Sequence, residues 1–233
     1  MRTSIRPLVS RLRSALLFSA GLMAISSATT HAAPPRPVLS TSPSPVVWDV
    51  PPVIPVFGHD AVGVADPLGE FVLVIRDFAL NPIAGATVTL DFSSCADLRL
   101  CVDPHDASAV VNCAQGTLAK VTDQNGRVRF RVVGCSVAAP GTAGAGASCA
   151  AVYADGVLGG FVPVAIYDLA GCDGLAPGDA SAWLTDYFSN LSPARGDYDA
   201  NGQMGAGDLS RWLVAFFANG SVANCSNGGR CGP

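Results

Sequence analysis

Residues 86–92 read ATVTLDF, and residues 127–133 read RVRFRVV. Both stretches alternate apolar and polar side chains with a period of two, which is typical of a β-strand with one buried face. In the second stretch we expect the arginines to face solvent and Val128, Phe130 and Val132 to face a core. These two stretches therefore predict a sheet that is covered on one side.

Several neighbouring stretches have the same character. Further strands are expected at residues 70–77, 116–122, 149–153 and 161–167, and turns at 81–85 (NPIAG), 123–126 (DQNG) and 154–156 (ADG). In the second turn, Asn-Gly supplies residues that accept a positive φ angle. Six or more short strands with frequent turns over about 120 residues predict an antiparallel β-sandwich.

The composition limits the function. The chain has 233 residues, of which only 14% are charged, with 18 acids against 14 bases. Seventeen of the acids are Asp, which suits turns, caps and calcium loops better than helix faces. Four bases lie in the first 13 residues, so the remainder carries 10 bases and 18 acids, a formal charge of −8. Without a basic cluster, we expect no nucleic-acid partner.

The first 32 residues have the pattern of a secretory signal peptide. An arginine-rich start precedes an apolar stretch at 15–25, and cleavage is expected after Ala32 or Ala33. The alternative is a first core helix. No later run of 18 apolar residues follows, so no transmembrane helix is expected. The proline-rich residues 33–55 predict an extended linker or a first edge strand, and we expect the linker at residues 33–45. We therefore expect a secreted or cell-surface protein.

All eight cysteines follow the predicted signal peptide. They are Cys95, Cys101, Cys113, Cys135, Cys149, Cys172, Cys225 and Cys231. An even number in an exported chain predicts disulfide bonds, although the sequence does not fix the pairing. The short spacings would allow Cys95–Cys101 and Cys225–Cys231 to close small loops.

The strongest pattern is an internal repeat near the end of the chain. Residues 168–188 and 197–217 align with an offset of 29 residues and share seven of 21 positions. Each copy predicts a 12-residue loop followed by one helix. A duplication explains this similarity most simply.

The second loop has the ligand spacing of an EF-hand-type calcium site. Its oxygen ligands stand at positions 1, 3, 5, 7 and 12: Asp197, Asp199, Asn201, Gln203 (through its backbone carbonyl) and Asp208. Gly202 at position 6 permits the sharp turn, and calcium prefers six to eight hard oxygens. The sequence therefore predicts a calcium site in this loop.

The first loop departs from that pattern. Asp168 and Asp179 keep positions 1 and 12, so they are weaker metal-ligand candidates. Position 5 is Cys172 and position 6 is Asp173, so side-chain ligands and the glycine are missing. We expect a disulfide from Cys172 to a C-terminal cysteine such as Cys225 to hold the loop instead.

Both predicted helices carry one apolar stripe. The stripes contain Trp183, Leu184, Tyr187, Phe188 and Leu191 in the first helix, and Leu209, Trp212, Leu213, Phe216 and Phe217 in the second. They form the core of this region, or part of each stripe forms a partner-binding face. A second alternative concerns Asp179 and Asp208, which could act only as helix N-caps.

Two resemblances follow from these motifs. The stretches EFVLVIRDFALNPIAGATVTLDF and KVTDQNGRVRFRVVG resemble a bacterial immunoglobulin-like domain of the invasin/intimin type, over roughly residues 60–167. This resemblance implies a rigid spacer or an adhesive module. The fold alone implies no chemistry.

The tandem loop–helix units at 168–217 resemble a dockerin module, in which a short Asp occupies position 12. This resemblance implies calcium binding and a cohesin-like protein partner. It also implies a link to assemblies that degrade polysaccharides.

Together these features predict a mainly β protein with two modules. An antiparallel immunoglobulin-like β-sandwich (46–167) precedes a small α-helical dockerin-like module (168–224), and residues 225–233 form a tail. We expect a non-catalytic function, calcium-dependent attachment to another extracellular protein, because His59 and His105 lie in no recognisable catalytic motif.

Two other functions stay open. One is a carbohydrate-binding or enzymatic component of a polysaccharide-degrading assembly, for which Tyr153 and Phe161 are the aromatic candidates on the sandwich. The other is a helical unit that is only a folded cap without a partner.

Overall fold

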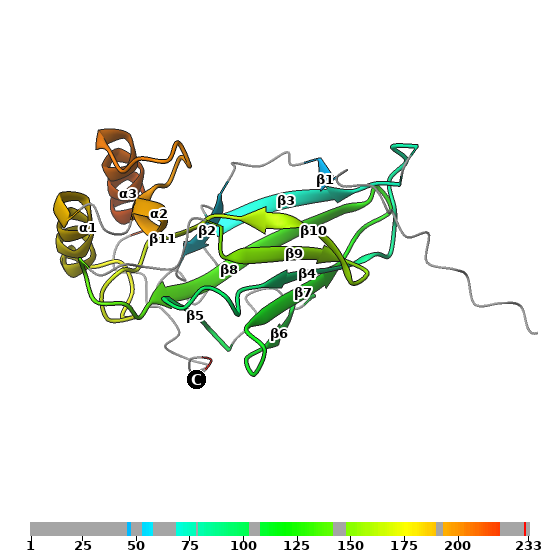
Figure 1. The fold of residues 1–233 in the computed structure, drawn as a ribbon, viewed down its shortest axis with the longest axis horizontal. Coiled ribbons are helices and arrows are strands. Elements are labelled where there is room, and N and C mark those ends of the chain that lie inside the picture. Colours follow the sequence, from blue (N-terminus) through cyan, green and yellow to red (C-terminus); the bar gives the residue numbers. More distant parts are fainter. Residues whose placement is uncertain are drawn as a thin grey trace, which may run out of the picture. The chain divides into compact units, whose positions relative to one another are not determined.

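A computed structural model describes residues 46–47, 53–57, 69–77, 79–102, 108–141, 148–189, 193–219 and 231 (Figure 1). Contacts divide the chain into Met1–Arg36 and Pro37–Pro233. The predicted signal peptide, the linker at 33–45, His59, His105 and most of the tail lie outside the described residues. No helix within these described ranges is long and apolar enough to cross a membrane.

The described part is mainly β and contains two sheets. The first sheet has the strand order β1-β3-β8-β2-β11, and β5 pairs with β8 beside this path. Its strands are β1 (Val46–Val47), β2 (Ile54–Phe57), β3 (Glu70–Ile75), β5 (Leu98–Leu100), β8 (Arg127–Ser136) and β11 (Val164–Ile166). The prediction of a purely antiparallel arrangement is wrong for this sheet, because β2 runs parallel to both β8 and β11.

The second sheet is antiparallel throughout, in the order β10-β9-β4-β7-β6. Its strands are β4 (Thr87–Asp91), β6 (Val110–Asn112), β7 (Thr117–Val121), β9 (Ala150–Ala154) and β10 (Val157–Val162). The predicted single strand at 161–167 is split at Pro163 between β10 and β11, which belong to different sheets. Proline lacks the N–H that a continuous ladder needs, so the chain changes sheet there.

The predicted alternation is confirmed on both central strands. Val128, Phe130 and Val132 of β8 are buried, whereas Arg127 and Arg129 are exposed. In β4, the buried side chains are Val88 and Leu90. The inward faces of the two sheets thus supply one shared core, as a period of two requires.

The hairpin turn before β8 forms at the predicted place. Asp123 Oδ1 accepts hydrogen bonds from the N–H groups of Asn125 and Arg127, and Gly126 has a φ of 69°. A Cβ atom at Gly126 would lie 2.5 Å from the carbonyl oxygen of Ile75. Glycine is therefore required there both by the backbone angle and by the close approach of β3.

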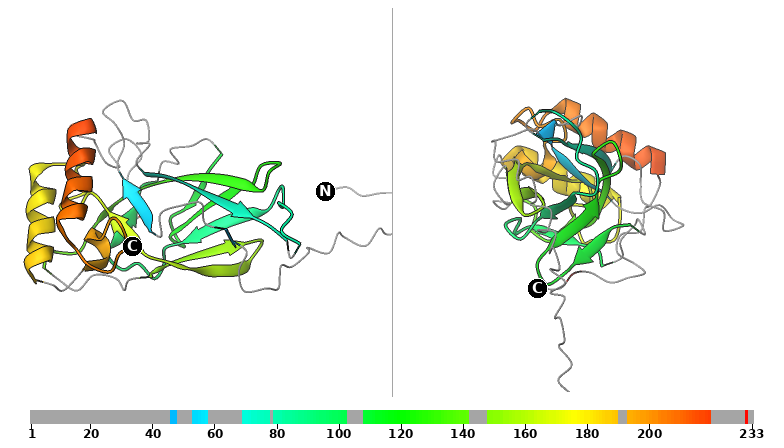
Figure 2. Two further views of the ribbon diagram at one scale, coloured as in Figure 1. Left: turned by 90° about the horizontal axis from the view of Figure 1, so that it is seen from above. Right: turned by 90° about the vertical axis from the view of Figure 1, so that its right-hand side faces the viewer.

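Two longer helices follow the sheets, as the repeat predicts. They are α1 (Pro177–Ser189) and α3 (Ala206–Asn219), and a short helix, α2 (Pro193–Gly196), lies between them in the chain. Both long helices lie at the same end of the sheets (Figures 1 and 2). Trp183 and Trp212, at equivalent positions, are buried in the same core cluster as the strands.

Three disulfides join segments that are distant in sequence: Cys95–Cys149, Cys113–Cys231 and Cys135–Cys172. The predicted local pairs Cys95–Cys101 and Cys225–Cys231 are therefore wrong, and so is the proposed partner Cys225 for Cys172. Sheet topology explains the first bridge, because Cys95 follows β4 and Cys149 precedes its neighbour β9. Cys101 is also disulfide-bonded.

Candidate metal centre

Loop 2, which we define as residues 197–208, is organised around one buried carboxylate. Asp208 Oδ1 accepts hydrogen bonds from the N–H groups of Tyr198 (2.7 Å) and Asp199 (3.2 Å). Asp208 Oδ2 accepts one from the N–H of Gly205 (2.9 Å). Asp208 is the third residue of α3, so this last bond closes the first turn of the helix in the manner of a capping box.

Loop 1, residues 168–179, repeats this network at equivalent positions. Asp179 Oδ1 accepts hydrogen bonds from the N–H groups of Leu169 and Ala170 (both 2.7 Å), and Oδ2 accepts one from Ala176 (2.7 Å). Every donor is offset by 29 residues from its counterpart in loop 2. The repeat in the sequence is therefore also a repeat in the hydrogen bonding.

Asp179 and Asp208 lie inside the first turns of the helices and are not N-cap residues. Both helices begin three residues earlier than the sequence indicated, so Asp179 and Asp208 are the third residues of α1 and α3. The capping positions are Ala176 and Gly205. Each acid reaches back to its capping residue and accepts three hydrogen bonds in all, which leaves about one of its four acceptor sites for a further partner.

Three of the predicted calcium ligands converge. Carboxylate oxygens of Asp197, Asp199 and Asp208 all lie within 4.8 Å of one another. Asp197 and Asp208 are buried, and Asp199 is half-buried. Such a group of hard oxygens, at loop positions 1, 3 and 12, fits a divalent cation such as calcium.

The geometry of Asp197 is fixed by the loop backbone. Its two carboxylate oxygens accept hydrogen bonds from the N–H groups of Asn201 (3.2 Å) and Gly202 (2.7 Å). Burial raises the pKa of Asp197, and the nearby charge of Asp208 raises it further. A bound cation would offset this repulsion, so the site favours positive charge.

The other two predicted ligands lie on the exposed part of the loop. The side-chain oxygen of Asn201 accepts a hydrogen bond from the N–H of Gln203 (2.9 Å). Both residues are exposed. Ligation through the Asn201 side chain and the Gln203 carbonyl stays a prediction.

Loop 1 also brings acids together, but with a different composition. Carboxylate oxygens of Asp168, Asp173 and Asp179 lie within 4.8 Å of one another. Burial raises the pKa of Asp179, and the charge of Asp173 adds a smaller rise. Sequence reasoning treated Asp173 only as a missing glycine, although an acid at position 6 was the available signal for a third carboxylate.

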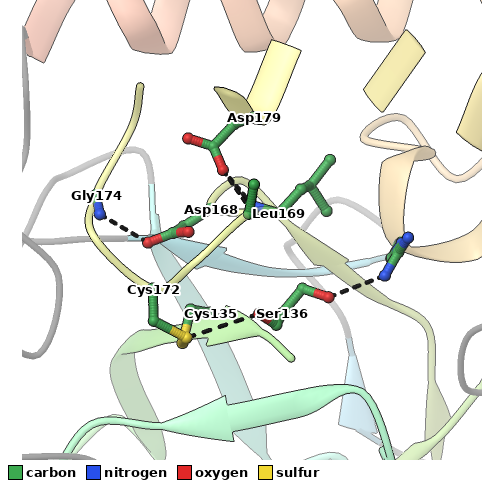
Figure 3. The surroundings of a disulfide bond; sticks show 9 residues. Cys135, Ser136, Asp168, Leu169, Cys172, Gly174 and Asp179 are labelled. Carbon is green, nitrogen blue, oxygen red and sulfur yellow. Dashed lines mark hydrogen bonds between the residues drawn. A yellow bond between two sulfur atoms is a disulfide. The ribbon is translucent and has the colours of Figure 1, made fainter. Parts of the chain in front are cut away.

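A disulfide ties loop 1 to the first sheet (Figure 3). Cys172, at position 5, pairs with Cys135 in β8, and the N–H of Ser136 donates to the carbonyl of Asp168 (2.8 Å). Asp168 Oδ2 in turn accepts a hydrogen bond from the N–H of Gly174 (2.9 Å). Loop 1 thus has a disulfide bond at position 5, where loop 2 has Asn201, a predicted calcium ligand.

A buried ion pair, not predicted from the sequence, anchors the helices. Arg195 of α2 contacts both oxygens of Asp186 in α1, with Nε at 2.6 Å and Nη2 at 2.7 Å. Its Nη1 also donates to the Ser136 hydroxyl at the end of β8 (2.9 Å). Because both charged groups are buried, the three elements are held in one arrangement.

The aromatic residues are arranged alike on α1 and α3. Trp183 stacks on Tyr187 (centroids 5.4 Å, 8°), and Trp212 stacks on Phe216 (5.2 Å, 14°). The next residue in each helix projects into solvent, since Phe188 is 80% exposed and Phe217 is 77% exposed.

The surface around these phenylalanines is poor in charge. The acids of α1, Asp179 and Asp186, are both buried, so its exposed face carries no charged side chain. The exposed face of α3 carries one, Arg211. We call the exposed apolar residues on the two helices the helix surface: Leu184, Tyr187, Phe188, Leu213, Val214 and Phe217.

Comparisons with known proteins confirm neither the resemblance to an immunoglobulin-like domain nor the resemblance to a dockerin module. No family model, curated protein or solved structure matches the chain.

Proposed function

We propose that the chain is an exported, non-catalytic attachment protein whose loop 2 binds calcium and whose helix surface binds another extracellular protein. The observation that carries this proposal is the convergence of Asp197, Asp199 and Asp208 at the start of α3. Three disulfides support export, because such bonds persist in oxidising compartments.

Calcium would act by ordering the first turn of α3. Asp208 belongs to both the acidic cluster and this turn. Asp197, at the start of loop 2, belongs to the same cluster and accepts a hydrogen bond from the N–H of Gly202. A cation shared by these carboxylates would remove their mutual repulsion and fix the loop against the helix. Calcium supplies only charge and coordination here, and the chain's own hydrogen bonds place the ligands.

The helix surface has the composition of a protein interface. Interface cores are depleted in charge and enriched in aromatic residues. Phe188 and Phe217 are exposed far more than is usual for large apolar side chains, and they occupy equivalent positions. We infer that each inserts into an apolar pocket of a cohesin-like partner.

The sandwich would serve as a spacer or adhesive body. The buried pair Arg195–Asp186 and the bridge Cys135–Cys172 connect the helices to the end of β8. The helix surface would therefore be fixed in position relative to the sheets, without a flexible joint between them.

The test is capture of exported proteins by the whole mature chain, with calcium and with chelator. We expect specific capture in calcium, lost in chelator and lost in the double variant Phe188→Ser/Phe217→Ser. Leu158→Ser, on β10 of the sandwich, is the matched control, because Leu158 is also an exposed apolar side chain. Capture that survives both chelator and the phenylalanine substitutions would refute the proposal.

A second candidate function is carbohydrate binding by the sandwich, as an accessory component of a polysaccharide-degrading assembly. Phe161 is 59% exposed and lies opposite Ala151, two residues from Tyr153 on the same face of the second sheet. Aromatic rings on a sheet face are able to stack on sugars. Saturable binding to a polysaccharide that is lost in Phe161→Ala, but retained in Phe217→Ala, would favour this function.

A further inference from the structure

A pocket of about 340 Å³ lies between the first sheet and α3. Its lining residues are Val53, Pro55, Tyr167, Tyr198, Ser210, Arg211 and Val214. They come from β2 and the residue before it, the segment after β11, loop 2 and α3. This volume falls in the usual range for small-molecule sites.

The floor of the pocket is apolar and rigid. Val53 and Tyr198 are buried, and the rings of Tyr167 and Tyr198 stack with centroids 4.3 Å apart. The Tyr198 hydroxyl donates to the carbonyl of Ile166 (3.1 Å). This bond fixes the phenol of Tyr198, and both tyrosines line the pocket.

The rim carries one positive charge. Nη1 of Arg211 donates to the carbonyl of Tyr198 (2.9 Å), which holds the guanidinium at the rim. Arg211 forms no ion pair with any acid in the described part of the chain, and none of the seven lining residues is acidic. Four of its five N–H donors are thus open to a ligand, and Ser210 adds a hydroxyl beside them.

We propose that this pocket binds a small apolar carboxylate. Its apolar group lies against Tyr167, Tyr198 and Val214, and its carboxylate pairs with the guanidinium of Arg211. A planar guanidinium offers parallel N–H donors that match the two oxygens of a carboxylate. Such a ligand is either a free organic acid or the C-terminal residue of a chain that ends in an apolar side chain.

The proposal does not depend on the proposed attachment function. The helix surface and the pocket share only Val214, and the acids of loop 2 do not line the pocket. A failed capture experiment would therefore leave the pocket untouched.

The test is an NMR titration of the whole mature chain, following backbone amide signals. The probes are 3-phenylpropionate and its neutral amide, 3-phenylpropanamide. A second pair, Ac-Gly-Ala-Phe with a free or an amidated C-terminus, distinguishes a free acid from a chain end. We expect saturable shifts at 198, 210–211 and 214 with the carboxylates, and binding about tenfold weaker with the amides.

Two substitutions sharpen the result. Arg211→Gln is expected to weaken carboxylate binding about tenfold, and Val214→Glu is expected to abolish it by placing an acid in the wall. The matched controls are Arg127→Gln, an exposed arginine of β8, and Val110→Glu on β6, where Val110 is 66% exposed against 62% for Val214. Equal binding of acid and amide, or shifts that are unchanged in Arg211→Gln, would overturn the proposal.

Discussion

Loops 1 and 2 share one hydrogen-bond network but differ in what holds them. In both, the acid at position 12 accepts hydrogen bonds from the same three backbone positions. Loop 1 is then joined to β8 by Cys135–Cys172, whereas loop 2 has a carboxylate at position 3, Asp199, where loop 1 has Ala170. The two copies of the repeated unit therefore share their packing but differ in the bonds that order the loop.

The largest expected effect on stability comes from the buried tryptophan that each copy of the repeat contains. Trp183→Ala and Trp212→Ala should each cost about 3–5 kcal/mol of unfolding free energy, because each deletes a buried indole. Each indole N–H also donates to a carbonyl, of Gly196 and of Tyr167 respectively. Urea unfolding measures both values.

The exposed phenylalanines serve as controls for this prediction. Phe188→Ala and Phe217→Ala should change stability by no more than about 0.5 kcal/mol. If one tryptophan proved dispensable while the other did not, the two copies would not be equivalent in packing.

The next largest effect comes from the disulfide bond, which loop 1 has and loop 2 lacks. Removing the bridge with Cys135→Ala/Cys172→Ala should cost about 2–4 kcal/mol, equally in calcium and in chelator. Hydrogen exchange at the amides of Leu169, Ala170 and Gly174 should accelerate. Cys95→Ala/Cys149→Ala is the control, since it removes a bridge between strands and should leave those amides protected. If added calcium restored the protection of these amides in Cys135→Ala/Cys172→Ala, loop 1 would depend on calcium, which would contradict the difference proposed between the loops.

A similar stabilisation is expected from calcium acting on loop 2. Calcium at 100 times its dissociation constant should stabilise the wild-type chain by about 2.7 kcal/mol. Asp199→Asn should abolish this gain, because it removes one of three converging charges. Asp173→Asn, the matched change in loop 1, should retain it. Thermal unfolding with and without calcium measures the difference, and equal behaviour of both variants would count against the assignment.

The smallest effect is a pH dependence in loop 1. Because the pKa of Asp179 is raised above 3.8 in the folded chain, the folded state binds this proton more tightly than the unfolded state. The charged form is therefore a cost at neutral pH, and this cost disappears as the pH falls through the folded pKa.

Asp173→Asn removes a charge beside Asp179 and should relieve part of that cost. We expect a gain below about 0.5 kcal/mol at neutral pH that vanishes in acid. The double-mutant cycle with Asp179→Asn provides the control, because the gain should be absent when position 179 cannot ionise. A gain that stayed the same in acid would show that it does not come from repulsion between the two carboxylates.

Local patterns predicted much of this molecule. Alternation predicted β4 and β8, and the 29-residue offset predicted that Asp179 and Asp208 would hold equivalent places. Sequence patterns missed β2, because Pro55 within it argues against a central strand, although β2 lies between β8 and β11.

What the sequence could not predict depends on long-range neighbours. Cys172 meets Cys135 only because loop 1 packs on the end of β8, and Arg195 meets Asp186 only through the path of α2. Neither pair has a spacing that local geometry recognises. Asp173 is a different case, because the acid at position 6 is visible in the sequence, and the fold of loop 1 brings its carboxylate to Asp168 and Asp179.

The most direct test of the central claim is a crystal structure of the mature chain grown with calcium. Our account predicts an ion within about 2.3–2.6 Å of oxygens from Asp197, Asp199 and Asp208, and none in loop 1. Loop 2 free of any ion at saturating calcium, or an ion held by loop 1 instead, would contradict it.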